Sequence, residues 1–527
     1  MIWTLVRKEL LTNLLTNLLT LRLIVALAFT VVLCLLTTLM GSLEFSVSVD
    51  AYQQALDERL EALNEATIYP RVEPHVLVPP QPVQILARGL AGGNGRRFEV
   101  FVDEYQEGSG ESVGSGEYDD LMQTLVRIDF STVVAILLSF LAVVIGFDCI
   151  SGEREQGTLR LLLSNPVPRA HIIAAKLVGG MLSLWVPLLL AYVVALSILL
   201  GNGDVQFSGD DWLRLGLMLA LSCLVLGLVF AFSAMVSSIT HNSATSLTVC
   251  LFVWLIAGVG YMNCLPGLTR YGVPYPPFWE YLTKMREVRQ TQAGEMEEWE
   301  ARNPPPGAAY MKSYSAGPLT RYSHPRGNAW REQRARFRFD QMLEYADEDF
   351  KYRTANQMPL AQQEFLVDKW AVLSPLTNYR SLMKYLARSS LDDLFFFSHF
   401  GQRYRVTYVD YLRTKMSSAS WRRWFTDDPV DQEPLVPDPE SVTADMLADG
   451  SDFMSSRAEW LERQQELAAR DPARTLDLTD LPKYGDGWKR TLGQSLTLMM
   501  PGLIVLLLSF SLCVTITVLR FVRYRFA

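Results

Sequence analysis

The sequence has 527 residues, of which 49% are hydrophobic and 20% are charged, and its formal net charge is −8. The charged residues are unevenly distributed, because residues 177–203, 215–269 and 491–519 contain no Asp, Glu, Lys or Arg. Apolar runs longer than about 18 residues are typical of membrane-spanning helices. This pattern excludes an ordinary soluble enzyme and a disordered chain. The negative charge also argues against a nucleic-acid partner.

Six segments are apolar and long enough for the roughly 20 helical residues that a bilayer requires. We predict the spans at residues 23–43, 130–147, 177–200, 215–237, 244–265 and 491–519, so that spans 3 to 5 occupy residues 177–265. The predicted fold class is an α-helical polytopic membrane protein. It has six transmembrane helices and two extracytoplasmic insertions, the larger of which is mainly helical.

The orientation follows from the Lys and Arg residues, which are enriched on the cytoplasmic side of membrane proteins. Ten basic and four acidic residues lie in segments 1–22, 148–176 and 520–527, whereas segment 44–126 has five basic and 15 acidic residues. We therefore predict that both termini and the loop 148–176 are cytoplasmic. The insertions 44–129 and 266–490 are then extracytoplasmic.

Hydrophobic spacing and composition predict the elements of the two insertions. In the first we expect a helix at residues 52–65 and a strand at residues 97–102. In the second we expect helices at Phe278–Arg302, Trp330–Gln357, Leu360–Val372, Tyr379–Leu386 and Phe453–Arg470. Just beyond span 5, five aromatic residues are typical of a belt at the membrane interface, namely Tyr271, Tyr275, Phe278, Trp279 and Tyr281.

The first 22 residues contain a four-residue repeat that places Thr12, Thr16 and Thr20 on one helical face. Together with Arg7 and Lys8, this repeat predicts an interfacial elbow helix before span 1. The alternative is a first span that is slightly longer than required.

The loop between spans 2 and 3 is predicted to contain a short helix. Ser151 is a candidate N-cap, and the carboxylates of Glu153 and Glu155 suit the positive end of a helix dipole. Leu159 contributes to an apolar face, and Pro166 would end the helix. Such a helix could contact a cytoplasmic partner or pack on its own bundle, and both interpretations stay open at this level.

Residues 151–169, followed by Lys176, resemble the coupling segment of ABC-2 type transporter permeases. The start Arg7-Lys8-Glu9-Leu10 is similar to the N-terminal elbow of that family. The large insertion before the last span resembles a subgroup that includes gliding-motility permeases. Two stretches support this subgroup, residues 80–90 and 374–412.

The resemblance implies a permease subunit that pairs with a second permease and is driven by a cytoplasmic ABC ATPase. The implied ATPase contacts are Gly152, Glu153, Arg154, Glu155, Gly157, Thr158 and Leu159, flanked by the elbow residues Arg7, Lys8 and Glu9. His241, between spans 4 and 5, is either a polar turn residue or a second contact. The location implied is the inner membrane of a bacterium.

No phosphate-binding G-x-x-x-x-G-K-[ST] loop occurs in the sequence. We therefore expect no catalytic residue and no cofactor on this chain, with ATP and Mg²⁺ bound by the partner ATPase. No H-E-x-x-H or C-x-x-C spacing predicts a metal site. The six cysteines lie in or beside apolar runs and are expected to be small buried side chains.

Two modes of action fit these features. The chain could export a substrate, or it could belong to a mechanotransmission complex that acts on an extracytoplasmic protein partner without transport. A membrane-anchored extracytoplasmic enzyme and a structural scaffold are further alternatives. The near absence of ionisable residues within the spans argues against an ion-coupled transporter or a channel.

Overall fold

The structure is a computed structural model that describes residues 21–523, except 67, 70–71, 73–74, 90–95, 101–104, 107–128, 160–166, 274–277, 312–313, 317–318, 323, 419–437 and 471–475. Within this part of the chain, six helices are long and apolar enough to cross a membrane, which confirms the predicted fold class. They lie at Ala28–Glu65, Phe130–Glu155, Arg169–Gly201, Gly209–Ile239, Ser243–Thr269 and Leu492–Val522.

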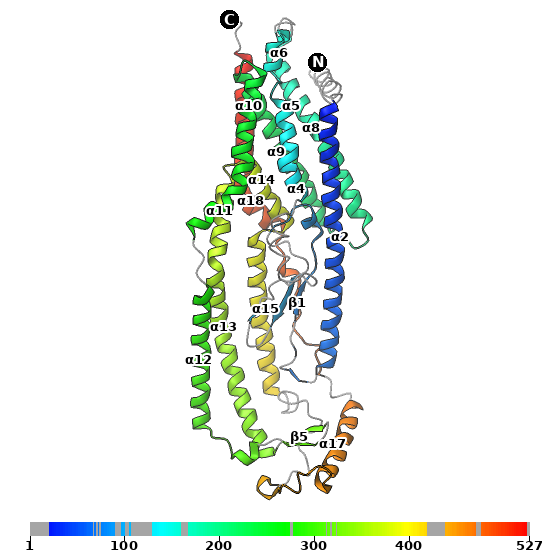
Figure 1. Ribbon diagram of the computed structural model, residues 1–527, viewed down its shortest axis with the longest axis vertical. Coiled ribbons are helices and arrows are strands. Elements are labelled where there is room, and N and C mark those ends of the chain that lie inside the picture. Colours follow the sequence, from blue (N-terminus) through cyan, green and yellow to red (C-terminus); the bar gives the residue numbers. More distant parts are fainter. Residues whose placement is uncertain are drawn as a thin grey trace.

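The spans gather into a bundle at one end of an elongated molecule, and the remaining helices form a long arm at the other end (Figure 1). The bundle comprises the first half of α2 (Leu21–Glu65), α4 (Phe130–Val133), η4 (Val134–Leu138), α5 (Ser139–Gly146), α8 (Arg169–Gly201), α9 (Gly209–Ile239), α10 (Ser243–Val253), η5 (Trp254–Gly260), α11 (Tyr261–Gly272) and α18 (Leu492–Val522). Helix α2 begins and helix α18 ends at the end of the bundle that is opposite the arm.

Helix α2 is longer than the sequence predicted. Span 1 and the expected helix at residues 52–65 are one continuous helix of 45 residues. At 1.5 Å per residue, this helix is about 67 Å long and reaches well beyond the bundle. The reason is local, because no proline or glycine follows Gly41 within it to interrupt the helix.

Helix α9 lies at the centre of the bundle and packs through small residues. A Cβ atom at Gly146 of α5 would lie only 2.6 Å from the Cβ of Ser233, and one at Gly180 of α8 would strike the ring of Phe230. Close approach of this kind is the usual way in which membrane helices gain packing energy, since lipid tails are as apolar as the side chains.

The arm consists of the second half of α2, the helices α12 (Phe278–Arg302), α13 (Pro325–Ala371), α15 (Leu391–Ser418) and α17 (Asp452–Arg470), and two small sheets. Helix α13 merges two predicted helices, since it continues through Pro359. Helix α15 was not predicted. The first sheet has the antiparallel order β1-β2-β3, with strands His75–Val78, Arg96–Val100 and Tyr105–Gln106.

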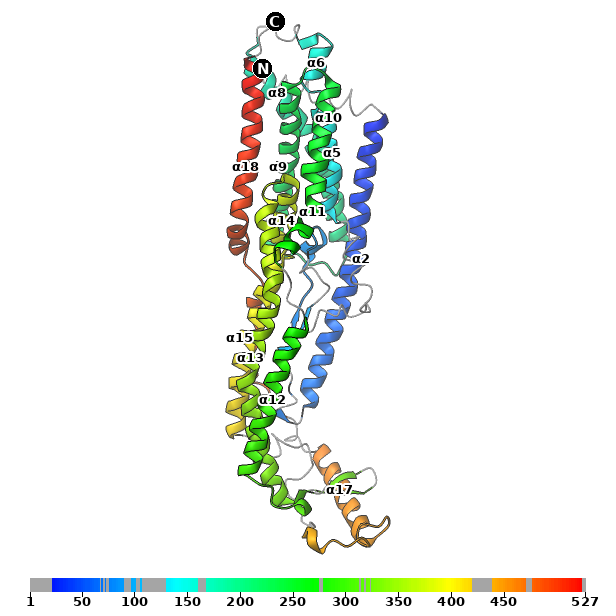
Figure 2. The ribbon, with the colours of Figure 1, turned by 60° about the vertical axis from the view of Figure 1, so that its left-hand side comes forward.

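Helices α12 and α13 form a hairpin that runs along the arm (Figure 2). Trp299 stacks on Phe337 with ring centroids 5.4 Å apart. Farther along the seam, Gln341 and Tyr345 both donate hydrogen bonds to Glu295, at 2.7 and 2.6 Å. The bond from Tyr345 lowers the pKa of Glu295 and raises the pKa of Tyr345 to about 12. These two hydrogen bonds fix the position of α13 along α12.

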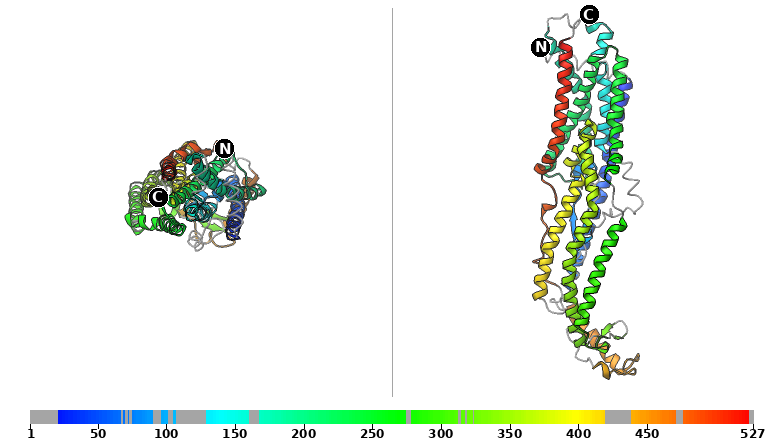
Figure 3. Two further views of the ribbon diagram at one scale, coloured as in Figure 1. Left: turned by 90° about the horizontal axis from the view of Figure 1, so that it is seen from above. Right: turned by 90° about the vertical axis from the view of Figure 1, so that its left-hand side faces the viewer.

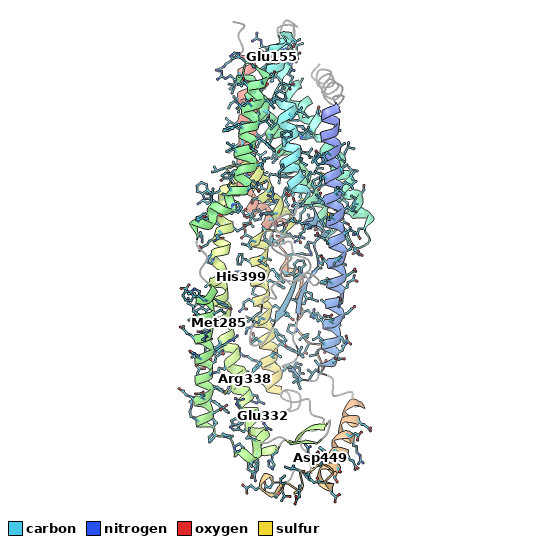
Figure 4. All side chains as sticks on the ribbon, in the orientation of Figure 1. Glu155, Met285, Glu332, Arg338, His399 and Asp449 are labelled. Atoms are coloured by element: carbon cyan, nitrogen blue, oxygen red, sulfur yellow. The ribbon has the colours of Figure 1, made fainter. Side chains whose placement is uncertain are left out.

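A second, separate core holds the second half of α2 against α15 and the first sheet within the arm. Tyr404, Tyr408 and Leu412 of α15 are buried in it, with Trp488 and Val76 of β1. From α2, Arg59 donates a 2.9 Å hydrogen bond to the hydroxyl of Tyr484, which lies in the segment leading to α18. Helix α17 and the hairpin of β4 (Tyr314–Ala316) and β5 (Leu319–Tyr322) form the far tip of the arm, where Figure 4 places Asp449.

Helix α14 (Pro375–Ala387) lies in the bundle, although its residues belong to the predicted outer insertion. The Tyr379 hydroxyl is 2.8 Å from the Ser222 hydroxyl of α9, and the Asn378 amide donates to the carbonyl of Gly502 in α18 at 2.9 Å. Leu376 packs on Gly258 in span 5. Helix α14 therefore re-enters the bundle from the side of the arm.

The segment around η3 (Pro82–Ile85) closes over the outer end of α14. Ser389 donates to the carbonyl of Ala87 at 3.0 Å, and Gln84 donates to the carbonyl of Arg388 at 2.9 Å. Residues 80–90 and 374–412, which both supported the predicted subgroup, therefore meet in space. Gly89 has no room for a side chain, since a Cβ atom there would lie 2.0 Å from the Ser389 carbonyl oxygen.

We predict that Gly89→Ala destabilises the protein by about 1–3 kcal/mol, the usual cost of overpacking, because the Ser389 backbone cannot move aside freely. Heating in mild detergent followed by size-exclusion chromatography would measure this loss. Gly203→Ala is the matched control, because a Cβ atom there meets nothing within 4 Å. Equal thermal stability of the two variants would contradict the predicted packing.

Candidate functional site

The short helix α6 (Ser151–Glu155) lies at the end of the bundle opposite the arm (Figures 1 and 3). Ser151 is not its N-cap, which corrects the sequence prediction. Helix α6 is the last part of the helical stretch Phe130–Glu155 and follows the turn at residues 147–150, with Ile150 at the N-cap position. The Ser151 hydroxyl donates to the carbonyl of Phe147 at 3.0 Å. The backbone N–H groups of Ile150 and Ser151 donate to the buried hydroxyl of Ser237 in α9.

Glu153 connects α6 to span 3. Its carboxylate lies 2.6 Å from the ammonium of Lys176 in α8, and the two side chains are 25% and 5% exposed, respectively. A buried ammonium requires such a partner, because the loss of hydration costs several kcal/mol per ion. Glu153 is therefore engaged within its own chain.

Arg154 and Glu155 connect α6 to the ends of spans 4 and 5. Arg154 donates to the carbonyl of Thr240, which caps the C-terminus of α9, at 2.7 Å. Glu155, labelled in Figure 4, accepts hydrogen bonds from the backbone N–H and the hydroxyl of Ser243, the first residue of α10, at 3.2 and 2.7 Å. The positive charge of Arg154 lies at the C-terminus of α9 and the negative charge of Glu155 at the N-terminus of α10, and both arrangements are favoured by the helix dipoles.

The connection to span 6 comes from the far end of the same loop. Arg169, the first residue of α8, donates to the carbonyl of Val522 at the C-terminal end of α18, at 3.2 Å. Ser246 of α10 donates to the carbonyl of Phe147 at 2.7 Å. Helix α6 is therefore bonded to spans 3, 4 and 5, and the first residue of span 3 is bonded to the end of span 6. A displacement of α6 would act directly on spans 3, 4 and 5.

The surface that α6 leaves free is small. Gln156, Gly157 and Thr158 are exposed beyond the helix, and Gly157 adopts φ +74°, which reverses the chain at low cost only for glycine. Leu159 is 3% exposed and belongs to the core of the bundle. Gly152 is half-buried, so of the predicted contacts Glu155, Gly157 and Thr158 are the most accessible.

The remaining predicted contacts are placed as follows. His241 is exposed in the connection between α9 and α10, two residues before Ser243, which binds Glu155. Arg7, Lys8 and Glu9 lie outside the described residues. Among the residues that the structure describes, no group of three or more His, Cys, Asp or Glu side chains could hold a metal ion.

Two π-helical segments lie between α6 and α14. Span 2 contains η4 and span 5 contains η5, and the indole N–H of Trp254 in η5 donates to the hydroxyl of Ser139 at 2.9 Å. Helix α14 packs against both segments. Segments of this type are frequent at functional sites, because the extra residue in one turn weakens the regular helical ladder. The sequence offered no signal for either one.

Sequence reasoning also missed a cluster of charges at the outer end of α14. Arg388, which ends the helix in the left-handed conformation, bonds to Asp210 and lies 3.4 Å from Asp211. Arg214 is fully buried and donates to Asp210 at 2.8 Å and to the Leu386 carbonyl at 3.0 Å. Burial raises the pKa of nearby Asp393, which the adjacent charge of Arg490 opposes.

We predict that Lys176→Met destabilises the protein by about 3 kcal/mol, at the lower end of the cost of breaking a buried ion pair, because Glu153 keeps some contact with water. The double variant Glu153→Gln/Lys176→Met should be more stable than Lys176→Met, since it leaves no unpaired charge. Thermal aggregation in detergent is the measurement, with Lys351→Met on the exposed face of α13 as the control. A double variant as unstable as Lys176→Met would show that the pair does not hold α6.

Comparison with known proteins identifies the family of the chain. A profile of the ABC-2 family transporter protein matches residues 3–524. The "probable ABC transporter permease protein NosY" of Stutzerimonas stutzeri is 31% identical over 128 residues, which cover 24% of this chain and 46% of that protein. The protein of the same name from Pseudomonas aeruginosa is 29% identical over 139 residues, 26% of this chain and 50% of the relative. The chain thus spans about half the length of these relatives, and the match to nearly all of its own residues shows that it belongs to the ABC-2 family of membrane transporter proteins.

Proposed function

We propose that this chain is the permease subunit of an ATP-driven exporter, and that a separate cytoplasmic ATPase docks on the exposed residues 156–158 next to α6. The observation that carries this proposal is the attachment of α6 to spans 3, 4 and 5. A displacement of α6 would therefore be transmitted to these spans of the bundle. ATP and Mg²⁺ would be bound by the ATPase and not by this chain.

The proposed docking surface differs in one respect from the surface that the sequence predicted. Glu153 is paired with Lys176, so it would position α6 and would not face the ATPase. Gly157 and Thr158 would be contact residues, together with Gln156, and His241 would flank them through its neighbour Ser243. Leu159 would anchor the loop in the bundle.

The orientation in this proposal rests on the basic residues near α6. Arg169, Arg520 and Arg523 lie at this end of the bundle, whereas segment 44–126 has five basic and 15 acidic residues. The rule that basic residues stay inside then makes this end cytoplasmic and directs the arm outward. The membrane would be the inner membrane of a bacterium, and a second permease would complete the transporter.

We predict that Thr158→Lys abolishes co-purification of the ATPase and ATPase stimulation while leaving thermal stability unchanged, because Thr158 is exposed and the substitution changes the charge of the docking surface. Purification from the native membrane with quantification of the ATPase is the measurement. The matched control is Thr283→Lys on the exposed face of α12 in the arm. Normal ATPase recovery with Thr158→Lys would overturn the docking surface.

A second candidate function is force transmission to an extracytoplasmic protein partner without transport. One observation favours it, the continuity of α2 from the bundle into the arm, where Arg59 holds it to Tyr484. A straight helix of this length would carry a displacement of span 1 to the second core of the arm.

The two functions differ in what the arm does during ATP turnover. If force is transmitted, the distance between spin labels at Glu61 on α2 and Thr291 on α12 should change when ATP is added to the complex, because α2 would shift against the hairpin. Pulsed electron spin resonance would measure this distance. An unchanged arm together with substrate-stimulated ATP hydrolysis would favour export.

A further inference from the structure

The last turns of α13 present apolar side chains that no described residue of the chain covers. Phe365 is 68% exposed and Trp370 is 48% exposed, and Leu373, in the turn after the helix, is 68% exposed. On a helix these three positions fall on one side. An exposed stripe of this kind, on residues that the sequence assigns to a polar insertion, requires an explanation.

Hydrogen bonds and packing contacts show how deep this stripe lies alongside the spans. The Tyr261 hydroxyl donates to the carbonyl of Trp370 at 2.8 Å, and Tyr261 lies eight residues inside the end of span 5 at Thr269. At 1.5 Å per residue this is a depth of about 12 Å. The next contact, Leu376 on Gly258, is 11 residues inside the same end, or about 16 Å.

A contact with span 6 gives a similar depth. Asn378 at the start of α14 bonds to Gly502, ten residues inside the start of α18 at Leu492. That is about 15 Å from the end of span 6. Span 5 has 27 residues and α18 has 31, so the turn between α13 and α14 lies about a third of the way along both helices from the arm end. The hydrocarbon core of a bilayer is about 30 Å thick and shorter than these helices, which places the turn inside the leaflet on the side of the arm.

The exposed side chains of α13 change from apolar to polar near residue 363, where the helix passes the end of span 5. Gln363 donates to the carbonyl of Val273 at 2.6 Å, which places residue 363 beside the segment that follows span 5. On the bundle side of this point the exposed side chains are Phe365, Lys369, Trp370 and Leu373. On the arm side, the described residues from 344 to 362 that are exposed include no large apolar side chain, namely Glu344, Glu348, Lys351, Ala355 and Gln362. A boundary between water and lipid produces this change.

The opposite side of the same helical turns is polar and turns toward α14. Asp368 accepts hydrogen bonds from Ser381 and Tyr385 of α14, and Glu364 pairs with Lys384 at 3.5 Å. The carboxylates of Glu364 and Asp368 are therefore paired inside the hairpin. Irregular backbone at membrane depth is tolerated on this condition.

We propose that α13 and α14 form a re-entrant hairpin whose first limb faces lipid, with Phe365, Trp370 and Leu373 in contact with acyl chains of the leaflet on the side of the arm. The partner of this surface is the bilayer. The surface continues the lipid-facing side of span 5, where Phe252 and Leu255 are 64% and 58% exposed. Trp370 lies at a depth where its ring packs on acyl chains, and Lys369 can extend its ammonium toward the head groups.

The aromatic residues beyond span 5 support the same boundary. Tyr271 is 92% exposed and Trp279 is 64% exposed, as an interfacial belt requires, whereas Tyr281 is half-buried. Tyr275 and the side chain of Phe278 lie outside the described residues. This proposal depends only on the membrane location of the chain, so the failure of the transport mechanism would not affect it.

The test is the collision accessibility of nitroxide labels on the full-length chain, with its native cysteines replaced, in phosphatidylcholine liposomes. Labels at Phe365→Cys and Leu373→Cys should collide with oxygen several-fold more often than with a water-soluble nickel chelate. Phe252→Cys in span 5 is the lipid reference. Lys351→Cys, on the exposed face of α13 beyond the proposed boundary, is the water reference.

Each other outcome would overturn the proposal. High accessibility to the nickel chelate at residues 365 and 373, equal to that at residue 351, would place the stripe in water. Low accessibility to both reagents would show that protein covers it, in the first instance a second copy of the chain.

A second measurement uses the chain with its native cysteines and without labels. It is the quenching of tryptophan emission by phosphatidylcholine that is brominated in its acyl chains. Trp370→Phe should remove part of that quenching, and unchanged quenching would count against lipid contact.

Discussion

The position of α14 inside the bundle is the constraint on which the outer half of the structure depends. A short helix that ends within a bundle leaves backbone groups and polar side chains where no water can satisfy them. The structure satisfies them with protein. Ser222 and Gly502 bind Tyr379 and Asn378 near the start of the helix, and Arg214 binds the carbonyl of Leu386 at its end. The deep end of α14 therefore requires partners from spans 4 and 6.

The same constraint explains why charges are buried at the outer end of the bundle. Arg214 and Arg388 are almost inaccessible to solvent, which costs several kcal/mol per ion unless opposite charges and hydrogen bonds offset the loss. Asp210 and Asp211 provide that offset from the first turn of α9. Helix α9 thus supplies both Arg214 and the acidic residues that bind the end of α14. Ser389, just after α14, in turn donates a hydrogen bond to the carbonyl of Ala87 in the segment around η3. The charged cluster is thus a joint between three segments that are far apart in the sequence.

At the other end of the bundle, α6 forms a second polar joint of similar design. Its short length leaves it little stability of its own, so its position is set by hydrogen bonds to the termini of neighbouring spans. Between the two joints, η4 and η5 meet through Trp254 and Ser139 and pack against α14. This gives a continuous series of contacts from α6 to α14. In the proposed transporter, that series would connect the ATPase to the outer end of the membrane path.

The sequence by itself determined the six spans, because long apolar runs have one stable solution in a bilayer, and it determined the isolated helices Phe278–Arg302 and Phe453–Arg470 within a residue of their observed bounds. It also located the loop at α6 and the family. Only the tertiary structure decided which surface α6 leaves exposed, since Glu153 and Glu155 find partners in α8 and α10 that no local pattern reveals. The re-entry of α14 was equally hidden, because its polar residues are typical of a soluble helix until Ser222, Gly502 and Asp210 are brought beside them. Hydropathy reports the average surroundings of a segment, whereas the pairing of individual polar groups depends on contacts between residues that lie from 23 to 178 positions apart.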